Sequence, residues 1–364
     1  MSGASPAGPL TGRSDLDAVD NDQSHDVTAN GELIGQLADH LGTVMGVPVS
    51  FVGRAPGNSH DGFVFATAGG RKVLIRLDPE VGPFLHYDGA GEARLMSSLA
   101  QVGVPVPAVL DAGGPDLFGA PFLVIEWIEG AVHHPRRAAD LDRDTRLLFA
   151  REMADVLGQL HGVQLDAIDR GAYLGTTGGV DDSSGDLHSS LFDQFDAVLD
   201  TLEILEAPVL DYVRIWLERH LRDSGGPATL VHGDFRLANL VWQGPRIAAV
   251  LDWETARIGN PLFDVGWMCM SAHNGSDIIM GLVSRDEFVQ MYRDATGRAI
   301  DDRDVVLWQV AASWVRGCTE VRLADLALRS REPGSVEARD LSWQFGAHRT
   351  DAELLRLIET YEAR

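Results

Sequence analysis

Cysteine is scarce in this chain of 364 residues, which contains only Cys269 and Cys318. Neither belongs to a paired-cysteine motif, so a structural zinc site is not expected. Both lie in apolar segments with helical spacing, which favours two buried free thiols, although the sequence leaves a disulfide between them open. This low cysteine content is typical of an intracellular protein.

Long apolar runs are also lacking. No stretch of 18 or more apolar residues occurs, and the first 30 residues are polar and acidic. We therefore expect neither a membrane-spanning helix nor a secretory signal. The sequence predicts a cytoplasmic protein, a monomer or homodimer, that has no membrane partner.

Basic residues are in the minority, because 30 Lys and Arg stand against 54 Asp and Glu, a formal net charge of −24. Nucleic acid is therefore not an expected partner, since phosphate binding requires a basic surface. The acidity would suit a cationic small-molecule substrate, but an acidic surface that favours solubility explains it more simply. Lys72 is the only lysine in the chain.

The chain is long enough for two lobes, and 45% hydrophobic residues can supply a core to each. Residues 1–27 contain few apolar side chains and predict a disordered tail. Residues 28–128 predict a small lobe with helices at 31–41 and 91–102. Its five expected strands are 49–52, 62–67, 72–77, 106–111 and 121–127.

Residues 129–364 have mostly helical spacing and predict a second, larger lobe. The expected helices are 145–160, 188–204, 207–222, 261–271, 285–296, 302–328 and 350–362. The predicted fold class is therefore α+β, with one helix packed on an antiparallel five-stranded sheet in the small lobe.

One segment carries polar residues in a pattern that phosphoryl transfer can use. Residues 230–242 read Leu-Val-His-Gly-Asp-Phe-Arg-Leu-Ala-Asn-Leu-Val-Trp, and residues 250–254 read Val-Leu-Asp-Trp-Glu. Asp234, Asn239 and Asp252 thus fall on loops between short apolar strands. A base that accepts a hydroxyl proton and two oxygen ligands for Mg²⁺ are the parts that such a site needs.

The stretch 232–239, followed by Asp252-Trp-Glu, resembles the aminoglycoside phosphotransferase and choline kinase-like family, which is related to the protein kinases. The Phe-Arg pair within it and the stretch 259–264, Gly-Asn-Pro-Leu-Phe-Asp, are similar to one clade, the phosphotransferase-like domains found fused ahead of acyl-CoA dehydrogenases. The resemblance runs over most of residues 30–300. It implies a two-lobed protein kinase-like fold.

The resemblance also implies roles for individual residues. Asp234 would orient the acceptor hydroxyl as the catalytic base, and Asn239 and Asp252 would bind Mg²⁺. His232 would support the catalytic loop through hydrogen bonds. Arg236 would either stabilise charge on the transferred phosphate or pair with a surface carboxylate.

A cation on the strand at 72–77 is expected to contact the α- and β-phosphates. Alternation puts Lys72, Leu74 and Arg76 on one face of this strand. The resemblance aligns Arg76 with the lysine of protein kinases and Glu92 with its acidic partner, and Lys72 is the rival. Because a guanidinium is planar and forked, this departure from lysine puts the affinity for ATP in question.

Two further segments are expected to bind the nucleotide. The loop at 55–62 lies between two strands, where its glycines permit close approach to phosphates. The segment 121–129 resembles the hinge that binds the purine, and it does not distinguish ATP from GTP. The proposed contacts are Gly57, Asn58 and Ser59 in the loop and Glu126, Trp127 and Ile128 in the hinge.

Other motifs have two interpretations. Asp264 either caps a helix or supports the catalytic loop. Glu254 either adds a metal ligand or pairs with Arg257. His133 begins a His-His pair that we assign to a surface loop, because no third ligand follows at metal spacing. The Gly-rich stretch 175–185 either covers a substrate pocket or is a passive surface loop.

The sequence thus predicts a small-molecule kinase that transfers the γ-phosphate of ATP or GTP to a hydroxyl. The acceptor is aminoglycoside-like or another metabolite, or else the hydroxyl of a hydroxyacyl-CoA or lipid, as the acyl-CoA dehydrogenase-associated clade implies. A catalytically silent pseudokinase that only binds nucleotide is the alternative from another class. The lack of a clear lysine on the third strand favours that alternative.

Overall fold

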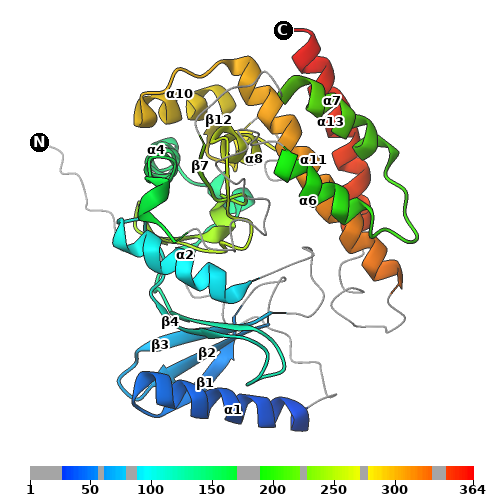
Figure 1. Ribbon diagram of the computed structural model, residues 1–364. Helices are drawn as coiled ribbons and strands as arrows, with labels where there is room; N and C mark the ends of the chain where they lie inside the picture. Colours follow the sequence, from blue (N-terminus) through cyan, green and yellow to red (C-terminus); the bar gives the residue numbers. More distant parts are fainter. Residues whose placement is uncertain are drawn as a thin grey trace, which may run out of the picture.

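The computed structural model describes residues 27–55, 61–78, 88–169, 189–221, 228–270, 278–329 and 342–364. Three of the predicted phosphate-loop residues, Gly57, Asn58 and Ser59, lie outside the described residues. The predicted tail up to residue 26 and the stretch 175–185 lie outside them as well. The described chain forms a small lobe of strands and a larger helical lobe (Figure 1).

The small lobe is built on a five-stranded sheet in the order β1-β2-β3-β5-β4, in which every neighbouring pair is antiparallel. The fold class predicted from the sequence is confirmed. The strands are β1 (Val49–Arg54), β2 (Asp61–Thr67), β3 (Lys72–Leu77), β4 (Val109–Gly113) and β5 (Phe122–Glu126). β4 begins three residues later than expected, because Pro105 and Pro107 have no N–H to donate to a ladder.

Two helices flank this sheet, and both were expected, although the sequence predicted only one of them packed on it. Helix α1 (Val27–Met45) buries Leu37 and Leu41 against Phe65 and neighbouring strand residues. Helix α2 (Gly89–Gln101) lies between the sheet and the larger lobe (Figure 1). The buried face of α2 belongs to the core of the larger lobe, so this helix connects the two parts.

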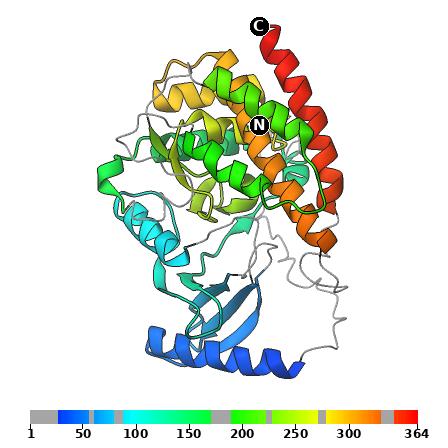
Figure 2. The same ribbon diagram turned by 45° about the vertical axis from the view of Figure 1, so that its right-hand side comes forward.

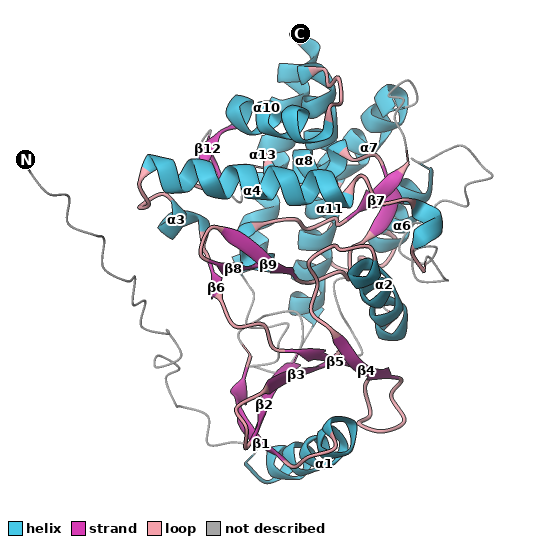
Figure 3. Ribbon diagram, turned by 90° about the vertical axis from the view of Figure 1, so that its left-hand side faces the viewer, coloured by secondary structure: helices cyan, strands magenta, loops and turns pink. Residues whose placement is uncertain are grey.

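The larger lobe begins with the short strand β6 (Ala131–Val132) and continues with helices. These helical elements are α3 (Pro135–Ala138), α4 (Arg143–Leu160), η2 (Leu165–Ala167), α6 (Ser189–Leu199) and α7 (Pro208–Leu221). The strands that follow are β7 (Thr229–Val231), β8 (Leu240–Gln243), β9 (Arg246–Val250) and β10 (Arg257–Gly259), with the short turn η3 (Leu237–Asn239) before β8. Strands β6, β8 and β9 form a sheet that faces the small lobe (Figure 3).

The rest of the larger lobe packs around one long helix, α11 (Asp302–Arg329), which is buried along most of its length. It lies beside α13 (Ser342–Glu362), as Figure 2 shows in orange and red. The remaining elements are α8 (Leu262–Met268), β11 (Ile278–Ile279), β12 (Val283–Ser284) and α10 (Arg285–Thr296).

Every helix predicted for the larger lobe is present, with three marked differences in length. The helix expected at 261–271 is the shorter α8, which ends at Met268. The helix expected at 188–204 ends at Leu199, because the buried Asp325 carboxylate accepts the backbone N–H groups of residues 203–205 and holds them in a turn. The last helix begins at Ser342 instead of residue 350. Among the described helices, none has both the length and the apolar character needed to cross a membrane.

Candidate active site

The loop between β7 and β8 carries the predicted catalytic residues. Strand β7 pairs with β10, and the chain then turns sharply at Gly233, which has a φ of +87°. A Cβ atom at Gly233 would lie 2.5 Å from the backbone oxygen of Thr255. Only glycine fits this position, for both its dihedral angle and its close contact with the neighbouring chain.

Asp264, on α8, supports the catalytic loop. Its carboxylate accepts the backbone N–H groups of His232 and Gly233, each at 2.8 Å, and contacts His161 Nε2 at 3.0 Å. His161 Nδ1 in turn lies 2.6 Å from the Tyr292 hydroxyl. Burial acts to raise the pKa of Asp264, but its bonds to His161 and its proximity to His232 outweigh burial and lower it. The charged carboxylate is therefore the stable form here.

Asp264 does not cap α8, which was the other interpretation of this residue. The side chain of Asn260 accepts the N–H of Leu262 at 2.9 Å and so takes the capping position. The guanidinium of Arg257, which the sequence offered as a partner of Glu254, lies 3.8 Å from the centre of the Phe263 ring. Burial lowers the pKa of Arg257 to about 10, against the opposing effect of the Asp264 carboxylate.

His232 connects the catalytic loop to the strand end that precedes Asp252. Its Nδ1 accepts the backbone N–H of Asp234 at 3.2 Å, so its Nε2 carries the proton and donates to the backbone oxygen of Leu251 at 3.0 Å. Burial lowers the pKa of His232, although the carboxylates of Asp264 and Asp234 oppose this shift. These contacts require a neutral imidazole ring, which links two backbone segments through its hydrogen bonds.

The Asp234 carboxylate accepts hydrogen bonds from three side chains. Arg236 Nε lies 2.8 and 2.9 Å from its two oxygens, and Asn239 Nδ2 lies 2.8 Å from Oδ2. Trp267 Nε1 donates to Oδ1 at 2.7 Å. Arg236 therefore pairs with the carboxylate of the site itself, whereas one sequence interpretation gave it a surface carboxylate.

Asn239 and Asp252 have oxygen atoms that fit a magnesium ion. Asn239 uses its amide nitrogen on Asp234, which leaves Oδ1 as the atom available to a metal. The backbone oxygen of Asn239 accepts the N–H of Leu251 at 2.8 Å, which brings Asp252 beside it. Asp252 has a φ of +67°, a conformation that costs energy outside glycine and is typical of functional positions. One carboxylate and one amide oxygen are ligands that Mg²⁺ accepts.

Arg76 on β3 and Glu92 on α2 form an ion pair, as the alignment predicted. The Arg76 Nη2 contacts Glu92 Oε2, and Nε donates to Asp78 at 3.1 Å. Burial acts to lower the pKa of Arg76, but Glu92 and Asp78 outweigh this and raise it. Glu92 Oε1 also accepts the backbone N–H of Trp253 at 3.2 Å. A single carboxylate thus joins β3 to the residue that follows Asp252.

Lys72, the rival cation, points to a different part of the small lobe. Its ammonium group lies 2.8 Å from Glu129 Oε1 and 5.9 Å from the centre of the Trp127 ring. Strand β3 alternates as predicted, with Val73, Ile75 and Leu77 buried and the other three residues half-buried. Lys72 and Arg76 therefore share a face but lie at opposite ends of it.

The predicted hinge follows β5, and two of its backbone N–H groups are already paired. Glu126 N donates to Ala108 O at 2.9 Å, and Trp127 N donates to Lys72 O at 3.2 Å. No hydrogen bond from the N–H of Ile128 is found among the residues that the structure describes. The backbone of Ile128 is therefore the hinge donor that a purine ring could use.

Some residues of the site were not identified from the sequence. Trp267 follows Asp264 by three positions, so both fall on neighbouring parts of one helical face, and that spacing was a usable signal. His161 and Tyr292 gave no local signal, since they reach Asp264 only through the tertiary fold. Asp78 lies two residues after Arg76 along the extended chain, and its role depends on how β3 ends.

Two other predictions concern residues away from this site. Both cysteines are buried free thiols, and burial raises the pKa of Cys269 to about 12. His133 lies in a loop, as predicted, but it is half-buried, with its ring beside the stacked rings of Phe149 and Trp242. Within the described ranges, no group of three or more His, Cys, Asp or Glu side chains could hold a metal.

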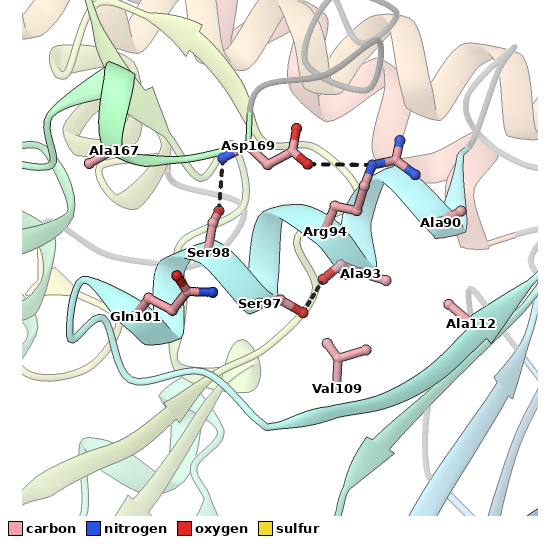
Figure 4. A pocket seen from close by; sticks show the side chains of 10 residues that line it. All are labelled: Ala90, Ala93, Arg94, Ser97, Ser98, Gln101, Val109, Ala112, Ala167 and Asp169. Carbon is pink, nitrogen blue, oxygen red and sulfur yellow. Dashed lines mark hydrogen bonds and ion pairs between the residues drawn. The ribbon is translucent and has the colours of Figure 1, made fainter. Parts of the chain in front are cut away.

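A pocket of about 600 Å³ lies outside the candidate site, between α2, β4 and the segment after η2 (Figure 4). Small side chains such as Ala93, Ser97 and Ala112 line it, and Arg94 reaches across to Asp169. These helix residues lie on the face of α2 opposite Glu92. None of the candidate catalytic residues contributes to this pocket.

The model of the phosphotransferase enzyme family matches residues 50–307, which include every predicted site residue. The chain belongs to this family. Mouse acyl-CoA dehydrogenase family member 10 is 30% identical over 223 residues, which are 59% of this chain and 20% of that protein. The chain thus spans about a fifth of that relative's length. The resemblances to the family and to the acyl-CoA dehydrogenase-associated clade are confirmed.

Solved structures support the same fold. A proposed aminoglycoside phosphotransferase from Ralstonia eutropha has a TM-score of 0.70 at 23% identity, over 90% of this chain and 98% of that one. The ternary complex of APH(2″)-IIa with streptomycin and ATP has a TM-score of 0.53 at 15% identity, over 78% of this chain and 88% of that one.

Proposed function

We propose that this phosphotransferase family member transfers the γ-phosphate of ATP or GTP to a hydroxyl group of a small molecule. The observation that carries the proposal is the cluster at the end of the catalytic loop. Asn239 joins it through both its side chain, which contacts Asp234, and its backbone, which contacts the residue before Asp252. Hydrogen bonds thereby connect the proposed base, Asp234, with the two proposed metal ligands, Asn239 and Asp252.

Asp234 would accept the hydrogen bond of the acceptor hydroxyl and orient its oxygen toward the phosphorus atom. Phosphoryl transfer passes through a loose transition state, so positioning contributes more than a strong base does. Arg236 lies beside this carboxylate and would stabilise negative charge on the transferred phosphate. When bound, Mg²⁺ would neutralise charge on the phosphates, held through Asn239 Oδ1 and Asp252.

Arg76 would contact the α- and β-phosphates, with Glu92 fixing the direction of its guanidinium. The hinge would bind the purine edge through the N–H of Ile128 and the oxygen of Glu126, beside Trp127. The ATP bound to APH(2″)-IIa supports a nucleotide site in this fold. The choice between ATP and GTP is part of the test.

Two acceptor classes remain, each with its own support. Streptomycin in the APH(2″)-IIa complex and the acidic charge of this chain favour an amino sugar or similar cation. The 30% identity to mouse acyl-CoA dehydrogenase family member 10 favours a hydroxyacyl thioester or lipid-type hydroxyl. A coupled ADP-release screen over amino sugars, macrolides, choline-like amines and hydroxyacyl-CoA compounds separates them.

The base is tested with Asp234→Ala, which should abolish any activity found in the screen. The metal ligand is tested with Asp252→Asn, which should remove the thermal stabilisation by ATP that depends on Mg²⁺. Asp294→Asn, the same change at an exposed position on α10, is the matched control and should keep that stabilisation. A protein that binds ATP equally well with and without Mg²⁺ would instead be a silent nucleotide-binding module.

A further inference from the structure

Trp267 lies in the last turn of α8, and its only polar atom points at the proposed base. The indole Nε1 donates to Asp234 Oδ1 at 2.7 Å, which is short for a nitrogen donor and typical of a charged acceptor. The side chain is largely buried, with an exposed fraction of 9%. An indole offers one donor and no acceptor, so the Trp267 side chain uses its one N–H on Asp234.

The ring of Trp267 packs against a neighbour on the same helix. It stacks on Phe263, with ring centres 6.1 Å apart and planes 23° from parallel, and the guanidinium of Arg257 covers the Phe263 ring in turn. The backbone of α8 is also fixed at Gly266, where a Cβ atom would lie 2.5 Å from the backbone oxygen of Trp308 on α11. Trp267 thus extends from a rigid part of the larger lobe.

The other two donors to Asp234 have further roles in the proposed reaction. Arg236 is one-third exposed on the catalytic loop and is proposed to meet the transferred phosphate. Asn239 is proposed to bind the metal through the other atom of its amide. Both sit on the same loop as Asp234, so they move with it. Trp267, by contrast, donates from α8, outside this loop.

We propose that Trp267 is a positioning residue, which fixes the Asp234 carboxylate relative to the larger lobe so that it meets the acceptor hydroxyl in one orientation. This inference rests on the proposed function. The simpler alternative is that Trp267 is a core residue whose N–H takes the nearest acceptor. In that case its loss would change stability and leave the rate of transfer as it is.

The contact itself can be tested without any activity. In ¹H–¹⁵N spectra of the full chain, the indole resonance that disappears in Trp267→Phe identifies Trp267 among the eight tryptophans. In Asp234→Asn this resonance should shift, because an uncharged amide replaces the charged acceptor. The indole resonance of Trp314, which donates to Leu210 O at 3.0 Å in the core, should stay in place. An unmoved Trp267 resonance would overturn the proposal.

The function is tested by the rate of phosphate transfer, to the acceptor found in the screen or to water if none is found. Trp267→Phe keeps an aromatic ring and removes the donor, so kcat should fall about 10- to 100-fold, as expected for one bond to a charged group. The KM for ATP should stay within about twofold, since the nucleotide contacts are elsewhere. Trp314→Phe also removes one buried indole bond and should leave both constants unchanged.

A second variant covers the case in which Trp267→Phe does not fold. Phe263→Leu keeps the indole N–H but removes the ring on which it stacks, and it should lower kcat by a smaller factor. If Trp267→Phe kept the wild-type kcat while Asp234→Asn was inactive, the role of Trp267 would be overturned and the proposed function would stand. Full activity in Asp234→Asn would instead overturn the proposed function, so the two failures are distinguishable.

Discussion

Arg76 and Glu92 form an ion pair that joins the sheet of the small lobe to helix α2, with exposed side-chain fractions of only 12% and 1%. The same Glu92 carboxylate also accepts the backbone N–H of Trp253, which follows Asp252. In the proposed function, the pair would therefore connect the nucleotide contact Arg76 to the metal ligand Asp252.

Glu92→Gln should lower the free energy of unfolding by about 3 kcal/mol, because it removes one charge of a buried ion pair and leaves Asp78 as the carboxylate beside the Arg76 guanidinium. Glu129→Gln is the matched control. It removes the charge from an ion pair with Lys72 in which Glu129 is 70% exposed, so we expect a loss below about 1 kcal/mol. Urea denaturation of both variants measures the difference. Equal losses would show that the Arg76–Glu92 pair is no stronger than a surface pair.

Arg76→Met should weaken the binding of Mg²⁺-ATP about 10- to 100-fold, since a charge-assisted bond to phosphate is lost. Lys72→Met should change the affinity by less than about twofold, because Lys72 pairs with the exposed Glu129. Isothermal titration calorimetry, at a temperature where circular dichroism shows both variants folded, gives the comparison. A larger effect at Lys72 would make it the phosphate contact.

Gly233→Ala should destabilise the protein by about 3 kcal/mol or more, because the new Cβ atom would meet the backbone oxygen of Thr255. Gly244→Ala provides the control. Gly244 also has a positive φ, of +59°, but no atom lies within 4 Å of its ideal Cβ position. We expect a loss of about 1 kcal/mol there, from the dihedral angle alone. Thermal unfolding that ranks the two variants in the opposite order would contradict this.

Stability should fall as the pH drops below 6.5, in part because of His232. Burial lowers its pKa in the folded state from the ordinary value of 6.5, so the unfolded chain takes up the proton first. The stabilisation is complete above pH 6.5 and is lost as the pH falls toward the folded-state pKa. His232→Gln should therefore show a smaller drop in unfolding temperature between pH 7.5 and pH 5.5 than the wild type does. Equal drops would exclude His232 as the source.

Much of the fold could be predicted because its signals are local. The five strands and the helices of the larger lobe follow from period-2 and helical spacing, and the proline residues near β4 account for its later start. Helix α2 packs on strands β4 and β5 of the small-lobe sheet, as the sequence predicted. Its buried face also belongs to the core of the larger lobe, and this second contact could not be predicted from local spacing.

The sequence by itself determined the family, the fold class and the order of Asp234, Asn239 and Asp252, because residues close in sequence carry these signals. Only the tertiary structure decided which side chains contact these three residues and their loop. Trp267 and Asp264 contact the catalytic loop from a distant segment, and His161 contacts Asp264. The structure also shows that Lys72 pairs with Glu129, away from Arg76. Hydrogen bonds act over about 3 Å, so such partners are defined by packing and not by spacing along the chain.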